Sequence, residues 1–250
     1  MKILLTGATG YIGKRLLPVM ISHGHQVICC VRDKERFDSS GFNKHQVKVV
    51  EVDFLDEASL ENIPEDIEVA FYLIHSMSTT MSDFEKLERS SAENFRKRLN
   101  STEVRQVIYL SGIINEEKLS KHLSSRRAVE EVLSEGRYHL TTLRAGIIVG
   151  SGSASFEIIR DLVEKLPVMV APRWLNTRAQ PIAIRNVIQF LTGVLDNPEC
   201  FDRSFDIGGP EILTYREMLL QFASIRKLRR SIMVVPVMTP KLSSYWLYFI

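Results

Sequence analysis

Residues 1–17 of the chain read MKILLTGATGYIGKRLL, and this stretch decides the fold. Three apolar residues at positions 3–5 lead into glycines at positions 7, 10 and 13. Apolar residues then recur at helical spacing through positions 16–21. The pattern predicts a strand, a tight turn and a helix. A secretion signal would need about seven to fifteen consecutive apolar residues, so this segment is not interpreted as one.

The glycine turn has the spacing G-x-x-G-x-x-G over Gly7, Gly10 and Gly13, which differs from the commoner G-x-G-x-x-G. Glycine permits backbone angles closed to other residues and leaves no Cβ between the chain and a ligand. The N–H groups and positive dipole end of the following helix attract an anion. The turn therefore predicts a seat for a pyrophosphate. A turn that serves only strand and helix packing is the alternative.

Short apolar runs alternate with amphipathic stretches along most of the chain. The runs are KILLT, QVICCV, VKVVEV, EVAFYLI, QVIYLSG and HLTTLRAGIIV. Such alternation predicts an α/β fold, a doubly wound parallel sheet with helices on both faces. Ligands of these sheets bind at the carboxyl ends of the strands, so motifs at those ends matter most.

We expect residues 1–150 to form this core and residues 151–250 to form a small mixed lobe, interleaved with the core, over the substrate crevice. Within the lobe, the pattern predicts helices near 155–165 and 187–195 and a strand in SFDIGG at 204–209. The chain ends in the aromatic run YWLYFI at 245–250. We interpret this end as a truncation; a docked terminus and an anchor for a protein or membrane surface are the alternatives.

The composition of the chain bears on which classes of partner it can bind and on where in the cell it resides. The chain has 32 basic and 30 acidic residues, and this balance does not suggest a nucleic-acid partner. The basic run RKLRR at 226–230 is interpreted as a solvated turn, with phosphate or lipid-headgroup binding as the alternative. The three cysteines lack C-x-x-C spacing, which argues against a disulfide framework or a metal site and favours the cytoplasm. No apolar run reaches the roughly eighteen residues of a membrane span.

Four motifs carry a family resemblance: TGATGYIG at 6–13, VDFLD at 52–56, YLIHSM at 72–77 and LSG at 110–112. With them the chain resembles the atypical short-chain dehydrogenase/reductase superfamily, which includes NmrA-like and complex-I-accessory-like NAD(P)-binding proteins. The stretch from LRAGIIVGSGS to APRW, followed by TRAQPIAI, is similar to a bacterial subgroup of nucleoside-diphosphate-sugar-epimerase-like proteins. The resemblance implies a Rossmann fold and a bound dinucleotide.

The resemblance also assigns cofactor contacts to the glycine turn and to two strand ends. The turn residues Gly7, Thr9, Gly10, Tyr11, Ile12 and Gly13 would hold the pyrophosphate, Asp53 and Phe54 would contact the adenine, and Leu73, Ile74 and His75 would pass beside the ribose and phosphates. For Asp53 a helix N-cap is the alternative role. For His75 the alternative is a cap on the strand end.

The end of the second predicted strand, CCVRDKER, bears on the choice of dinucleotide. An acidic residue there binds the ribose 2′-hydroxyl of NAD, whereas an arginine accommodates the 2′-phosphate of NADP. Arg32 comes first and Asp33 second, so the sequence favours NADP and leaves NAD open. If the loop after Asp33 enters a helix, Arg36 lies one turn further on and could also bind the 2′-phosphate.

The resemblance implies a catalytic Tyr-x-x-x-Lys pair after the fifth strand. In KHLSSRRAVEEVL, at 121–133, His122 and Arg126 occupy these two positions, while Ser111 matches the serine that polarises the substrate. Histidine can act as an acid or base near neutral pH, and arginine supplies a permanent charge to the cofactor. A solvated helix face is the alternative for both residues.

Two functions therefore remain open. The first is an oxidoreductase or sugar-nucleotide-epimerase-like enzyme that acts on an unidentified small molecule by hydride transfer at the nicotinamide, near Ser111, His122 and the loop Arg144, Ala145 and Gly146. Further substrate contacts would come from Ser151, Ser153, Trp174 and Arg178. The second is a non-catalytic redox sensor or scaffold that binds the dinucleotide.

Overall fold

The computed structural model describes residues 1–74, 81–113 and 121–235, without the side chains of 81–84 and 121–123. The chain divides into two compact units. The first contains Met1–Ala145 and Arg185–Ile207, and the second contains Gly146–Ile184 and Gly208–Ile250. The helix and the strand expected at 187–195 and 204–209 therefore belong to the first unit and not to the small lobe.

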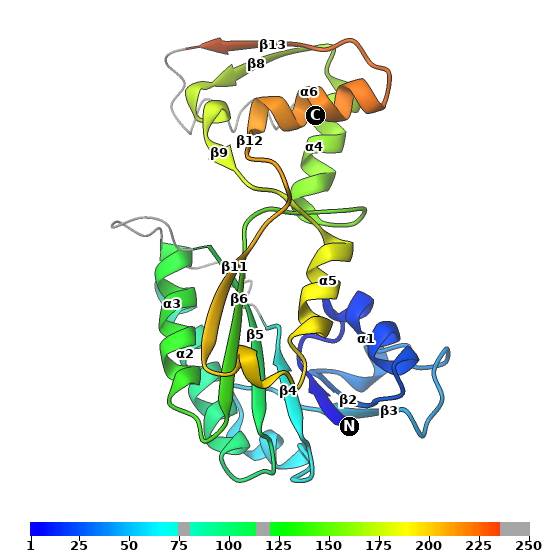
Figure 1. The fold of residues 1–250 in the computed structure, drawn as a ribbon, viewed down its shortest axis with the longest axis vertical. Coiled ribbons are helices and arrows are strands. Elements are labelled where there is room, and N and C mark those ends of the chain that lie inside the picture. The colour runs from blue at the N-terminus through cyan, green and yellow to red at the C-terminus, as the bar shows by residue number, and fades with distance from the viewer. Residues whose placement is uncertain (75–80, 114–120, 236–250) are drawn as a thin grey trace. The chain divides into compact units, whose positions relative to one another are not determined.

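A seven-stranded sheet organises the first unit, with the order β11-β6-β5-β4-β1-β2-β3 (Figure 1). Every neighbouring pair in it is parallel. The strands are β1 (Lys2–Leu5), β2 (Gln26–Val31), β3 (Val47–Glu51), β4 (Val69–Tyr72), β5 (Gln106–Gly112), β6 (His139–Ala145) and β11 (Arg203–Ile207). The predicted doubly wound parallel sheet is confirmed, and each of the six apolar runs contains a strand.

The order of the strands reverses beside β1. The chain runs outward from β1 through β2 to β3, then returns to place β4 on the other side of β1. In sheets of this kind, such a reversal opens a crevice at the carboxyl ends of the two central strands. The glycine turn directly follows β1, so it lies at this crevice.

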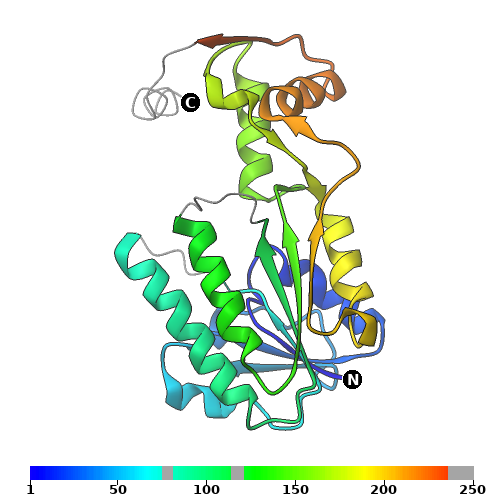
Figure 2. The same cartoon turned by 60° about the vertical axis from the view of Figure 1, so that its left-hand side comes forward.

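Helices cover both faces of the sheet (Figures 1 and 2). On one face, α2 (Met81–Leu99) packs beside α3 (Lys121–Ser134), while α1 (Gly13–Ser22) and α5 (Ile184–Gly193) lie on the other. Helix α1 buries Leu16, Leu17 and Met20, which is the helical stripe seen in the sequence. The short 3-10 helices of this unit are η1 (Lys34–Arg36), η2 (Glu57–Asn62) and η4 (Pro198–Cys200).

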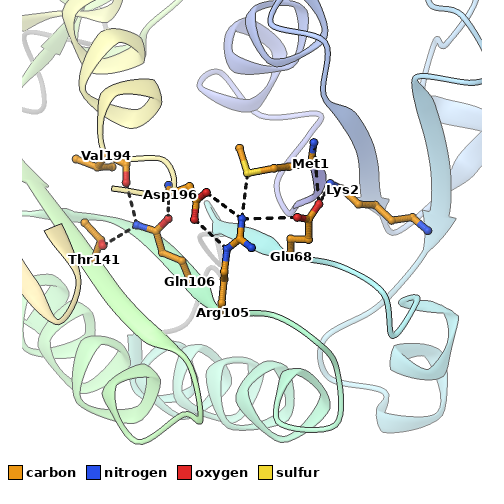
Figure 3. A network of polar contacts seen from close by, with 8 residues as sticks. All are labelled: Met1, Lys2, Glu68, Arg105, Gln106, Thr141, Val194 and Asp196. Carbon is orange, nitrogen blue, oxygen red and sulfur yellow. Dashed lines mark hydrogen bonds and ion pairs between the residues drawn. The ribbon is translucent and has the colours of Figure 1, made fainter. Parts of the chain in front are cut away.

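A buried polar network fastens the amino end of the sheet, opposite the crevice (Figure 3). Gln106, which has no exposed surface, donates to Thr141 Oγ1 and to the Val194 carbonyl, each at 2.9 Å. Its Oε1 accepts from the Asp196 N–H at 2.8 Å. Arg105 then donates to both carboxylate oxygens of Asp196 at 2.9 Å. The network attaches the connection between α5 and β11 to the amino ends of β5 and β6.

The second unit is a small α+β body. Helices α4 (Ala154–Lys165) and α6 (Tyr215–Ile225) pack together and against a parallel pair of strands, β8 (Val168–Pro172) and β13 (Ser231–Val235). Two further pairs are β7 (Ile148–Val149) with β10 (Ile182–Ala183), and β9 (Arg178–Ala179) with β12 (Leu213–Thr214). The 3-10 helix η3 (Arg173–Asn176) precedes β9.

The basic run at 226–230 has a structural role in this unit. Arg226 pairs with Glu164 at 3.0 Å, and the Arg230 guanidinium donates to the Val163 and Glu164 carbonyls near the end of α4. Cations at a helix C-terminus satisfy its last carbonyls and its dipole. Two of the four cations are thus engaged within the unit. Within the described residues, no helix is long and apolar enough to cross a membrane.

Candidate functional site

The glycine turn after β1 is shaped by two close backbone contacts. Gly7 has φ +63°, a left-handed conformation, and a Cβ there would lie 2.6 Å from the Leu73 carbonyl oxygen. A Cβ on Gly13 would lie 2.3 Å from the Gly7 carbonyl oxygen and 2.8 Å from the Ala8 Cα. Both glycines are therefore required by the packing of the turn itself.

Gly10 differs from its two neighbours. Its N–H donates to the Gly7 carbonyl at 2.9 Å, and a Cβ added to it would contact that same oxygen at 3.1 Å, the one neighbour within 4 Å among the described residues. Its φ lies outside the left-handed region, and the residue is exposed. The fold would therefore accept a side chain at Gly10 more readily than at Gly7 or Gly13. The absence of a side chain at Gly10 leaves its backbone accessible to a ligand.

The start of α1 faces the same turn. Its N-cap, Ile12, has no side chain that can cap the helix, and no acidic residue lies in the first turn of this fully described helix. The N–H groups of Lys14 and Arg15 donate to the Gly10 and Ile12 carbonyls, each at 3.0 Å, so the positive end of the helix dipole is the feature that attracts an anion here. Thr9 is exposed beside Gly10. Thr9 and Gly10 thus form the exposed surface of the turn, whereas Gly13 is buried.

Tyr11 and Arg15 brace this surface. The Arg15 guanidinium lies 3.9 Å from the centre of the Tyr11 ring, and its Nη1 donates to the Tyr11 carbonyl at 3.0 Å. The Tyr11 hydroxyl is buried and has no hydrogen-bond partner in the described part of the chain. The Tyr11 ring is thus held by the helix that follows it.

The end of β4 lies against the turn. Thr6 Oγ1 donates to the Phe71 carbonyl and accepts from the Leu73 N–H, each at 2.9 Å. These bonds and the close Gly7 contact bring Leu73 next to the turn, while the half-buried Ile74 packs against the core of the first unit. His75 lies outside the described residues.

The end of β2 presents Arg32. Its side chain is exposed and forms no ion pair within the described ranges. The Asp33 carboxylate instead caps η1, accepting from the Glu35 N–H at 2.9 Å, and it pairs with Arg36 at 3.1 Å. Arg36 therefore partners Asp33 in the structure.

The end of β3 corrects one expectation. Phe54 is 8% exposed, and its ring packs in the core against Phe95, with centroids 5.8 Å apart. The ring therefore does not cover a ligand, and only its backbone remains as a contact. Asp53 is exposed, and its Oδ1 accepts from the Leu55 N–H at 3.0 Å. The cap of η2 is Asp56, so Asp53 does not have the alternative N-cap role.

Ser111 lies near the carboxyl end of β5, under α3. It is 2% exposed, and its Oγ has no hydrogen-bond partner of good geometry among the described residues. Tyr109, two residues earlier on the same face, has its hydroxyl 3.4 Å from the Arg126 carbonyl. Burial raises the pKa of Tyr109 to about 12, an effect that Ser111 and the Arg126 charge partly offset. Ser111, Tyr109 and Arg126 are thus neighbours.

His122 and Arg126 both belong to α3, one helical turn apart, as the sequence predicts. Arg126 is half-buried and forms no ion pair in the described part of the chain. The His122 side chain lies outside the described residues. The sequence pattern does not single out Tyr109, because this residue sits inside an apolar run; its position two residues before Ser111 is the signal that places it on the same face.

Arg144, in the loop that we expect near the nicotinamide, forms an ion pair within the first unit. Its Nε and Nη2 donate to both carboxylate oxygens of Glu130 at 3.2 and 2.7 Å, and Ser204 donates to the same carboxylate at 2.7 Å. The hydrogen bonds that Arg144 donates to Glu130 raise the pKa of Arg144. This pair ties β6, α3 and β11 together.

The remaining predicted substrate residues belong to the second unit. Ser153 is the N-cap of α4, accepting from the Phe156 N–H at 3.2 Å. Trp174 and Arg178 are exposed in η3 and β9, and Ser151 is exposed before α4. Ser153 therefore has a structural role, and the other three remain candidates.

Metal or thiol chemistry finds no support in the described ranges. They contain no group of three or more His, Cys, Asp and Glu side chains arranged to hold a metal ion. Cys29 and Cys30 are buried in β2, and burial raises the pKa of Cys29 to about 12. A buried neutral thiol is a poor nucleophile, so both cysteines are core residues.

Comparison with known proteins gives consistent results. A family model described as NAD(P)H-binding matches residues 7–159. An isoflavone reductase homolog from Lupinus albus is 19% identical over 232 residues, covering 87% of this chain and 73% of the relative.

Solved structures share the fold. A nucleoside-diphosphate-sugar epimerase from Staphylococcus aureus has a TM-score of 0.79 at 15% identity, covering 98% of this chain and 84% of that one. A short-chain dehydrogenase/reductase superfamily protein from Agrobacterium tumefaciens, solved with bound NAD, has a TM-score of 0.75 at 14% identity, covering 94% and 85%. These structures confirm the fold that the resemblance implies, and the family model confirms its NAD(P)-binding character.

Proposed function

We propose a function from one established premise: the chain belongs to the NAD(P)H-binding family. The proposal is that it is an NADP(H)-dependent oxidoreductase of the short-chain dehydrogenase/reductase type that acts on a small molecule. The observation that carries it is the contrast at the end of β2, where Arg32 is exposed while Asp33 is engaged by Glu35 and Arg36.

The glycine turn fits a dinucleotide. Among the described residues, a Cβ at Gly10 would come within 4 Å of one atom, the Gly7 carbonyl oxygen, and the start of α1 beside it carries no acidic residue that would repel a phosphate. In this assignment, the turn from Gly7 to Gly13 holds the pyrophosphate. Leu73 and Ile74 contact the adenosine half, and Asp53, which is exposed after β3, contacts the adenine.

Selection of NADP rests on charge. The 2′-phosphate is an anion that a guanidinium binds through its planar fork of donors. An unengaged aspartate would repel it and bind a 2′-hydroxyl instead. Because Asp33 already accepts two partners, Arg32 is the available group at this strand end.

The bound dinucleotide supplies or accepts a hydride. The residues of this chain would manage the proton and the charge around that transfer. Within the described residues the Ser111 hydroxyl has no hydrogen-bond partner of good geometry, and the permanent positive charge of Arg126 acts on Tyr109, two residues before Ser111 on the same face. His122, one turn before Arg126, is the candidate acid or base because histidine titrates near neutral pH.

A second function has its own support. Ser111 is only 2% exposed, and the tyrosine and lysine of the usual pair are absent from their positions in α3. A protein that binds NADP(H) without turnover, as a sensor or assembly factor, would tolerate both features.

Turnover decides between the two functions. Purified protein would be mixed with NADPH and a panel of carbonyl compounds and quinones, and oxidation would be followed at 340 nm. The proposal expects oxidation that is lost in His122→Phe and retained in the exposed-site control His45→Phe. Tight NADPH binding without oxidation by any panel member would instead favour the sensor. The absence of NADPH binding would overturn both functions.

A further inference from the structure

The second unit carries an exposed tryptophan, Trp174, in η3. Its side chain is 53% exposed, whereas tryptophan is highly buried on average. The indole packs edge to face against Tyr215 at the start of α6, with ring centroids 5.6 Å apart and planes at 85°. Such a contact occupies at most one face of the indole, so the other face can stack on a ligand.

Three arginines lie next to this aromatic pair. Arg173 precedes Trp174, Arg216 follows Tyr215, and Arg178 lies in β9, which pairs with the strand directly before α6. All three side chains are exposed. None forms an ion pair within the ranges that the structure describes. Elsewhere in this unit, Arg160, Arg226 and Lys165 are paired with carboxylates.

The adjacent carboxylate, Glu217, is committed to the capping box of α6. It accepts from the Thr214 N–H at 2.7 Å and from Thr214 Oγ1 at 2.8 Å. These hydrogen bonds hold the pKa of Glu217 below its ordinary value, and the nearby charges of Arg178 and Arg216 add to the effect. The arginines outnumber this carboxylate, so the patch keeps a positive charge.

We propose that Trp174, Tyr215, Arg178 and Arg216 form a binding subsite for a planar ring that carries an anionic group. The indole face stacks on the ring, and the guanidinium donors bind the phosphate or carboxylate. Two sources share this chemistry: a nucleoside phosphate and an aryl carboxylate. The subsite deepens the proposed function, on which it rests, by naming the class of substrate.

Trp174 itself reports binding. The chain has two tryptophans, so Trp246→Phe leaves Trp174 as the sole indole. In that background, the full chain would be titrated with uridine 5′-monophosphate, benzoate, uridine and ribose 5-phosphate while the fluorescence is followed. We expect saturable quenching by a probe that has both ring and charge, and weaker binding of uridine and ribose 5-phosphate. Whichever of the monophosphate or benzoate binds more tightly identifies the source.

Variants test the assignment by calorimetry. Trp174→Leu and Arg178→Gln should each weaken the binding probe about tenfold or more, because stacking and a charged hydrogen bond are each lost. Arg229→Gln, which removes an exposed cation from the same unit, should leave binding unchanged. Ribose 5-phosphate binding that equals the monophosphate and survives Trp174→Leu would overturn the proposal, as would no binding of either ring-bearing anion.

The same variants separate this inference from the proposed function. NADPH affinity should be unchanged in Trp174→Leu, because the proposed cofactor residues belong to the first unit. Probe binding in a protein that fails to bind NADPH would leave the subsite standing and refute the proposed function. NADPH binding without probe binding would do the reverse.

Discussion

Substitution of the three glycines should separate ligand binding from folding. Gly10→Ala places a Cβ 3.1 Å from one carbonyl oxygen, a contact relieved by a shift of a few tenths of an ångström. Replacing a glycine also lowers the entropy of the unfolded chain by about 0.4–1 kcal/mol, which offsets this strain. The free energy of unfolding should therefore change by less than about 1 kcal/mol, or roughly 2–4 °C in Tm.

Gly13→Ala should behave differently. Its Cβ would lie 2.3 Å from the Gly7 carbonyl oxygen and 2.8 Å from the Ala8 Cα, and both are backbone atoms. Relief requires α1 to move away from the turn, so we expect a loss of about 3 kcal/mol or more, at the upper end of overpacking effects. Gly13→Ala is thus the folding control for Gly10→Ala.

Substitution of Gly10 should have a small effect on stability but a large effect on NADPH affinity. Gly10→Val keeps the fold but places a branched side chain where the backbone would approach the pyrophosphate, so NADPH affinity should fall about 100-fold, or about 2.7 kcal/mol. Thermal unfolding and calorimetric titration measure the two effects on the same samples. Wild-type affinity in Gly10→Val, or a Tm loss in Gly10→Ala as large as that of Gly13→Ala, would refute the reasoning.

Three further outcomes are expected. Arg32→Ala should weaken NADPH about tenfold or more and NADH little, by calorimetry; equal losses for both would place the 2′-phosphate elsewhere. Gln106→Leu should lower the free energy of unfolding by about 2–4 kcal/mol in urea titrations, because it leaves the Asp196 N–H and Val194 carbonyl without their partner, whereas the exposed control Gln221→Leu should not. The hydrogen bond from His139 lowers the pKa of Asp202, so its stabilising contribution is present above the ordinary aspartate pKa of about 3.9 and is lost as pH falls below it. The free energy of unfolding, measured in urea as the pH is lowered, should therefore fall less steeply in Asp202→Asn than in the unaltered protein. An unchanged slope of that free energy against pH would contradict the pairing of His139 with Asp202.

The strands and the turn could be predicted because their signals are local. A buried strand such as QVICCV reads as an apolar run, and the glycines around residue 10 stand directly between a strand and a helix. The resemblance added what spacing alone does not give, the nature of the ligand. It did not give the orientation of individual side chains at the strand ends.

The errors have physical reasons. The helix at 184–193 and strand β11 were expected in the small lobe because an apolar pattern shows that a strand is buried but not which strand it pairs with. Phe54 was expected over the adenine, although its position beside Phe95 of α2 depends on a contact far along the chain. Gln106 and Arg144 serve networks whose partners lie distant in the sequence, so no local pattern reveals them.

The most direct test of the central claim is a calorimetric titration of the unaltered protein with NADPH and, separately, with NADH. The account predicts saturable binding of NADPH at one site per chain, with an affinity at least about tenfold higher than that for NADH. Binding of neither dinucleotide, or tighter binding of NADH, would contradict it.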